Sequence, residues 1–101
     1  MVKLVALYRK PADPAAFDHA YLQTHVPLVK KIPNLRRVDV ARVTGAPRGE
    51  AEYYMIAEMY FDNKAAMDAA MASPENAEAG KNLMSFARGL VTFVYAEQVS
   101  E

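Results

Sequence analysis

The segment 53–61 is apolar on both faces of the strand that it is expected to form. Successive side chains of a strand point to opposite faces, so Met55 lies on one face while Ile56 and Tyr60 lie on the other. The segment 90–98 has the same pattern, with apolar residues at odd and even positions. An antiparallel sheet with one face in water alternates apolar and polar residues instead. Both faces of this sheet are therefore expected to be buried.

The order of elements predicts an α+β fold of the ferredoxin-like βαββαβ type, a four-stranded antiparallel sheet with helices on one face. Asp13-Pro14 and Ser73-Pro74 are typical helix starts, as is Asp62 or Asn63. The expected strands cover residues 2–8, 35–43, 53–61 and 90–98, and the expected helices cover 14–31, 64–72 and 74–88. The second helical segment is thus broken in two. Residues 1–101 form a single domain.

One layer of helices covers only one face of such a sheet. The other face would be an apolar patch larger than the few hundred Å² that monomers usually expose. The pattern therefore predicts a homodimer in which two sheets pack face to face and close an α/β barrel.

Charge and composition exclude several function classes. Twelve Lys and Arg balance twelve Asp and Glu among 101 residues, so no basic field favours nucleic acid or an anionic membrane. The chain has no cysteine and two histidines, which removes thiol chemistry and a His-rich zinc site within one chain. The apolar start is interrupted by Lys3 and predicts neither a signal peptide nor a membrane span. We expect a cytoplasmic protein without metal or cofactor.

The first expected helix carries the candidate chemistry. At ~100° per residue, with Phe17 at zero, Leu28 lies near ~20°, Tyr21 near ~40° and His25 near ~80°, whereas His19 lies near ~200°. His25 is therefore inside the apolar stripe and His19 is opposite it.

An inward histidine has two interpretations. It is the side chain that titrates near neutral pH, so His25 is a natural general acid or base. Alternatively, it is a structural residue whose ring nitrogens are satisfied by a backbone carbonyl and a tyrosine hydroxyl.

Pro27 follows two residues later, and it too has two interpretations. It lacks the backbone N–H and clashes with the carbonyl of Gln23, so it should kink the helix and open a pocket beside His25. Alternatively, the helix ends there in a looser turn.

These residues resemble the EthD family, which is named for a gene cluster of ethyl tert-butyl ether degradation. The pattern F-x-x-x-Y-x-x-x-H-x-P-L covers residues 17–28, and Ile32-Pro33-Asn34-Leu35 follows it. Ser73-Pro74-Glu75, Asn82 and Phe86 resemble a second stretch of the family, so the likeness spans nearly the whole chain.

The resemblance implies the dimeric α/β-barrel superfamily, with a pocket between sheet and helices in each protomer. Relatives include cofactor-independent monooxygenases, polyketide cyclases, muconolactone isomerases and haem-degrading enzymes, so the fold alone does not fix the function. It also implies that His25 is the acid or base where such a protein is catalytic. Many members have two adjacent aromatics where this chain has Ala20-Tyr21, which bears on substrate specificity.

Strand residues supply further candidates. Tyr8, Tyr60 and Tyr95 are phenols that can polarise a carbonyl or stabilise an oxyanion, or rim residues with one wet end. Asp39 either orients His25 or pairs with Arg37, or with an arginine of the partner protomer, in a solvated salt bridge.

Two main hypotheses follow. In the first, the protein is a cofactor-independent acid/base enzyme, an isomerase, a cyclase or a monooxygenase-like protein, acting on a small apolar oxygenated molecule. Its candidate catalytic residue is His25, and its candidate substrate-binding residues are Phe17, Tyr21, Leu28, Tyr60 and Phe86. In the second, the protein binds a hydrophobic metabolite without catalysis, as an accessory of a degradation pathway. A third hypothesis, haem ligation by His25, lacks a second polar distal group.

Overall fold

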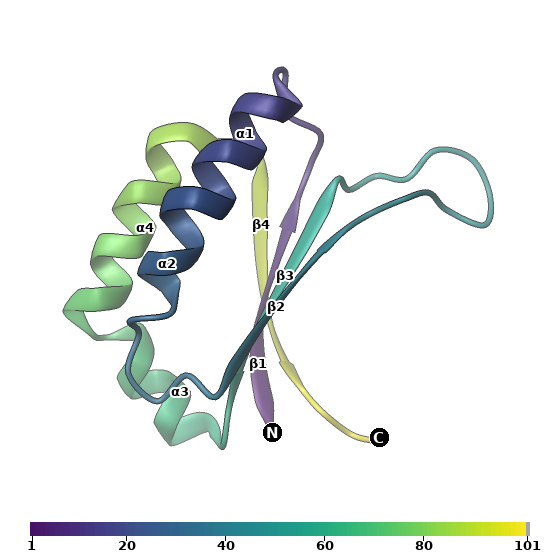
Figure 1. The fold of residues 1–101 in the computed structure, drawn as a ribbon. Helices are drawn as coiled ribbons and strands as arrows, with labels where there is room; N and C mark the ends of the chain where they lie inside the picture. The colour runs from purple at the N-terminus through teal and green to yellow at the C-terminus, as the bar shows by residue number, and fades with distance from the viewer. Residues whose placement is uncertain (101) are drawn as a thin grey trace.

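All helices lie on one side of a four-stranded antiparallel sheet (Figure 1). The computed structural model describes residues 1–100. The strands are β1 (Val2–Tyr8), β2 (Arg37–Arg42), β3 (Met55–Phe61) and β4 (Val91–Glu97). They lie in the order β2-β3-β1-β4, which confirms the expected ferredoxin-like arrangement. The sheet of one chain is open, with β2 and β4 as its edges, and is not itself a closed barrel.

The helices begin where the sequence places capping residues. They are α1 (Pro14–Ala20), the π-helical turn η1 (Tyr21–His25), α2 (Val26–Val29), α3 (Lys64–Met71) and α4 (Pro74–Ala87). The side chains of Asp13, Asn63 and Ser73 each accept a hydrogen bond from the backbone N–H three residues later. The predicted interruption of the second helical segment is confirmed. No helix within residues 1–100 combines the length and the apolar character needed to cross a membrane.

Pro27 lies inside the helical segment rather than at its end. The backbone N–H of Val26 donates to the carbonyl of Tyr21, five residues earlier, so the turn before the proline is π-helical. A wider turn of this kind relieves the clash between a proline ring and the preceding turn. The interpretation in which the helix stops at Pro27 is wrong, because the segment continues to Val29.

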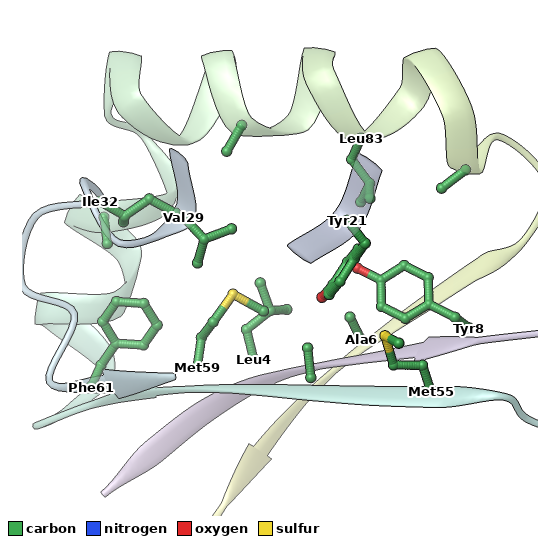
Figure 2. Close-up of a cluster of buried hydrophobic side chains, with 14 of the residues drawn as sticks. Leu4, Ala6, Tyr8, Tyr21, Val29, Ile32, Met55, Met59, Phe61 and Leu83 are labelled. Carbon is green, nitrogen blue, oxygen red and sulfur yellow. The ribbon is translucent and has the colours of Figure 1, made fainter. Parts of the chain in front are cut away.

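The core lies between the helices and one face of the sheet (Figure 2). Alternate residues of β1 and β3 point into it, and their partners come from the helical layer. The buried side chains of the two strands are Leu4, Ala6, Tyr8, Met55, Ala57, Met59 and Phe61. Those of the helices and of the segment after α2 include Phe17, Tyr21, Val29, Ile32, Met67 and Leu83.

The other face of the sheet has no helical layer over it (Figure 1). Strand register places Lys3, Tyr60 and Arg37 in one row across β1, β3 and β2. The Nζ of Lys3 lies 2.9 Å from Oε1 of Glu58, which belongs to the next row. Further along, this face carries apolar side chains such as Val94, which is 44% exposed. We call this surface the open face.

Candidate functional site

His25 is almost fully enclosed, at 5% exposure, and it lines a small cavity between the helices and the sheet. Aromatic rings surround it: its ring centroid lies 5.2 Å from that of Tyr21 and 6.3 Å from that of Phe86. Phe17 stacks on Tyr21 at 5.6 Å and contacts Phe86 edge-on at 5.6 Å. The helix register that places His25 and Tyr21 inward thus joins them into one aromatic cluster.

Asn82 of α4 holds the imidazole of His25. The Nδ1 atom of His25 lies 3.3 Å from Oδ1 of Asn82. Because an amide oxygen only accepts hydrogen bonds, Nδ1 carries the hydrogen in this arrangement and Nε2 keeps its lone pair. Burial lowers the pKa of His25 below its ordinary value of 6.5, and the hydrogen bonds to Asn82 and to the backbone of Ala79 oppose that shift. His25 is therefore neutral at pH 7 and able to act as a base.

A pair of buried tyrosines lines the same cavity. The rings of Tyr8 on β1 and Tyr21 on η1 meet edge-on with centroids 5.0 Å apart (Figure 2). Burial raises the pKa of Tyr21 to about 12, and a hydrogen bond from Tyr8 partly offsets the rise. Burial raises the pKa of Tyr8 even further. Both phenols thus remain neutral, and each keeps an O–H that can donate a hydrogen bond to a third group.

Small residues create the space beside these groups. Ala6 and Ala57 are register partners on β1 and β3, and Ala57, Ala79 and Gly80 line the cavity. The cavity volume is about 40 Å³. Sites for drug-sized ligands span roughly 300–1,000 Å³. An organic ligand therefore requires a side chain of the wall to move.

The side chains that could bind a metal ion do not gather at this cavity or elsewhere in residues 1–100. Within residues 1–100, no three or more His, Asp or Glu side chains come together in a way that would hold a metal ion.

Comparison with known proteins identifies the family. The sequence profile of the EthD domain matches residues 9–88. The chain belongs to the EthD family. An uncharacterised 11.0 kDa protein of Rhodococcus erythropolis, from the thcB-thcC intergenic region, is 37% identical over 98 residues, which cover 97% of this chain and 95% of that protein.

Solved structures agree with this assignment. A crystal structure of an ethyl tert-butyl ether D (EthD) family protein from Bacillus halodurans has a TM-score of 0.94 and 44% identity, covering 98% of this chain and 99% of that one. A dimeric ferredoxin-like protein of unknown function from Thermobifida fusca has a TM-score of 0.71 and 16% identity, covering 96% and 90% of the two chains. The second likeness shows the shared fold.

The structure of this EthD protein brings together some of the residues singled out from the sequence. His25 and Tyr21 line the cavity. Phe17 and Phe86 pack against their rings from outside it. His19 is exposed, as expected from its angle on the helix.

Leu28 is half-buried and does not line the cavity, whereas Val29 does. The π-helical turn adds one residue to the helix before this point, so Val29 takes the angular position expected for Leu28.

Tyr60 and Asp39 lie on the open face, away from His25. Strand register places Tyr60 beside Lys3 and Arg37, and Arg37 pairs with Asp39 at 3.1 Å. The predicted pairing of Asp39 with Arg37 is confirmed, and its alternative role in orienting His25 is wrong.

Sequence reasoning gave no place in this EthD site to Asn82 or to Phe93. Asn82 is recognisable in the sequence only through the family pattern, because its contact with His25 spans 57 positions along the chain. Phe93 of β4 also lines the cavity. The strand pattern marks Phe93 as apolar but does not show which face of the sheet the helices cover.

Proposed function

We propose that this EthD protein is a homodimer that binds a small apolar carbonyl compound between helices and sheet and transfers a proton on it. The observation that carries the proposal is one shared cavity with two complementary groups. A neutral histidine, His25, and a neutral phenol, Tyr21, both line it. A base beside a donor for a carbonyl oxygen is the arrangement that enolisation requires.

In the proposed step, Tyr21 donates a hydrogen bond to the carbonyl oxygen while Tyr8 supports it. Nε2 of His25 removes a proton from the carbon next to the carbonyl, which leaves an enolate and an imidazolium. The imidazolium then returns the proton to the same carbon or, where a double bond of the substrate is conjugated with the enolate, to the far carbon of that double bond, which amounts to isomerisation. Asn82 keeps Nδ1 protonated, so that Nε2 remains the base. No redox change occurs in this sequence.

The homodimer is supported by the open face. Val94 is 44% exposed and belongs to a face that no helix covers. The fold relative from Thermobifida fusca is itself described as dimeric. Two open faces packed together would bury these side chains and close the α/β barrel, while leaving the His25 cavity on the helix side of each protomer.

Exchange of hydrogen for deuterium tests the proton transfer without knowledge of the natural substrate. In D₂O, NMR follows loss of the α-hydrogens of three ketones and lactones: cyclohexanone, 2-tetralone and γ-butyrolactone. We expect the protein to accelerate exchange of at least one of them. His25→Gln should abolish the acceleration, and Tyr21→Phe should reduce it roughly a hundredfold, the scale of losing one oxyanion donor.

His19→Gln is the matched control, because His19 is an exposed histidine of the same helical segment. It should leave exchange unchanged. Exchange that no compound shows above the buffer rate, or that persists in His25→Gln, would contradict the proposed chemistry.

A second function is capture of the same class of molecule without catalysis. One observation favours it: His25 is 5% exposed and its Nδ1 lies 3.3 Å from Oδ1 of Asn82, as expected for a histidine with a structural role. In that case 2-tetralone raises the melting temperature, His25→Gln leaves its affinity unchanged, and no α-hydrogen exchanges.

A further inference from the structure

Phe93 stands at the boundary between the His25 cavity and solvent. It belongs to β4, an edge strand that pairs with β1 alone in the sheet order. Its side chain lines the cavity and is nevertheless 46% exposed. Its side chain is therefore in contact both with the cavity that His25 lines and with solvent.

The neighbours of Phe93 leave room for its ring to move. In the strand register Phe93 lies opposite Ala6, and Ala6 lies opposite Ala57, so the row beside the phenyl ring consists of methyl groups. Across the cavity, α4 presents Ala79 and Gly80. A side chain beside small residues, on an edge strand and with one face in solvent, meets little steric resistance to a change of rotamer.

No other residue of β4 lines this cavity within the part of the chain that the structure describes. Tyr95, two positions along on the same face of β4, is 66% exposed and lies outside it. The two aromatic residues thus share a strand, a face and partial exposure to solvent, but only Phe93 lines the cavity.

We propose that Phe93 is the gate and size-selecting residue of the His25 cavity. Its ring swings toward solvent and admits a flat carbonyl compound of one or two rings, whose body then takes the place of the phenyl group beside Ala6 and Ala57. This inference rests on the proposed ligand class, but the gate itself is tested without any ligand. The proposed dimer packs the opposite face of the sheet and leaves Phe93 free.

Labelling of His25 by diethyl pyrocarbonate measures access to the cavity, because the reagent acylates unprotonated imidazole nitrogen. Peptide mass mapping at pH 7 gives separate rates for His25 and for exposed His19, which serves as the internal reference. Relative to His19, His25 should react slowly in the wild type. Phe93→Ala should raise that relative rate roughly tenfold, as expected if opening costs about 1.4 kcal/mol. The matched control Tyr95→Ala should leave it unchanged.

The fold of each variant is checked by its melting temperature, and Phe93→Leu provides a smaller change if Phe93→Ala unfolds. Phe93→Leu should give a rate between those of the wild type and the alanine variant. Equal rates in the wild type and in the folded Phe93 variants would overturn the gate, as would an equal acceleration in Tyr95→Ala.

The two proposals fail separately. If Phe93→Ala exposes His25 but no ketone or lactone exchanges its hydrogens, the gate stands and the proton transfer does not. If exchange occurs but labelling is insensitive to Phe93, the chemistry stands and ligands enter elsewhere.

Discussion

The two faces of the sheet are both rich in apolar residues, yet their polar groups differ. On the helix side, His25 and the pair Tyr8 and Tyr21 lie among aromatic and aliphatic side chains and are held neutral by burial. On the open face, charged groups form their own pairs at one end of the sheet. Neutral buried groups thus lie on the helix side, and paired charges lie on the open face.

Tyr60 shows the contrast with Tyr21 most clearly. Its ring lies between two cations, with the Nζ of Lys3 5.3 Å and the guanidinium carbon of Arg37 4.3 Å from its centroid. Its hydroxyl donates to Glu58 at 3.3 Å. Tyr60, although only 8% exposed, therefore belongs to a cluster of charged groups on the open face, whereas Tyr21 lines the cavity on the helix side.

The largest effect is expected in the core on the helix side. Phe61→Ala removes a fully buried ring and should lower the free energy of unfolding by about 3–5 kcal/mol. Val94→Ala on the open face should cost about 1 kcal/mol or less, because the side chain is 44% exposed in one protomer. Urea unfolding at low protein concentration compares the two. Similar losses would show that the faces do not differ.

The next effect is on assembly. Val94→Asp places two like charges on the proposed dimer interface and should raise the dimer dissociation constant about a hundredfold or more. The core is untouched, so circular dichroism should remain that of a folded protein. Light scattering at micromolar concentration measures the mass. A monomeric wild type, or a variant that still dimerises like it, would contradict the proposed interface.

A smaller effect is expected in the pH dependence of stability, and it comes from His25 on the helix side. Because burial lowers the pKa of His25 in the folded state, the unfolded chain binds a proton first as the pH falls below 6.5. Stability should therefore decrease from pH 6.5 downward until the folded-state pKa is passed. In His25→Gln this decrease should be smaller. Urea midpoints at pH 7.5 and 5.5 measure it, and identical decreases in both proteins would remove His25 as the cause.

The smallest effect is expected at the ion pair of the open face. The hydrogen bond from Lys3 lowers the pKa of Glu58 below 4.5. The pair is partly exposed, at 26% and 32% for the two side chains, so Glu58→Gln should cost about 0.2–1 kcal/mol at pH 7. That difference should vanish as the pH falls through the folded-state pKa of Glu58. A loss as large as that of Phe61→Ala would show that the charged cluster is structural rather than peripheral.

The fold was predictable because local signals agree with one another. Asp13, Asn63 and Ser73 cap the helices that the apolar periodicity predicts, and the alternation within 53–61 gives the two faces of β3. The sequence does not show which face of the sheet the helices cover, since both faces carry apolar residues. For that reason the sequence alone does not separate Tyr60, on the open face, from the residues of the pocket.

The site was predictable only in part. His25 and Tyr21 follow from helical periodicity, but that periodicity assumes a regular turn. The π-helical turn before Pro27 shifts the later positions by one residue, which exchanges Leu28 for Val29. The partners Asn82 and Tyr8 come from other elements, and no local pattern reports contacts over such sequence separations.

The protonation state of His25 is the most direct test of the proposed proton transfer. Nitrogen-15 NMR of the imidazole rings, with His25→Gln used to assign the signal, reports which nitrogen carries hydrogen and at what pH the ring is charged. We expect that at pH 7 Nδ1 of His25 carries the hydrogen and Nε2 does not. We also expect the ring to become positively charged only below pH 6.5. A ring protonated on Nε2 alone, or already positively charged at pH 7, would contradict the proposed proton transfer.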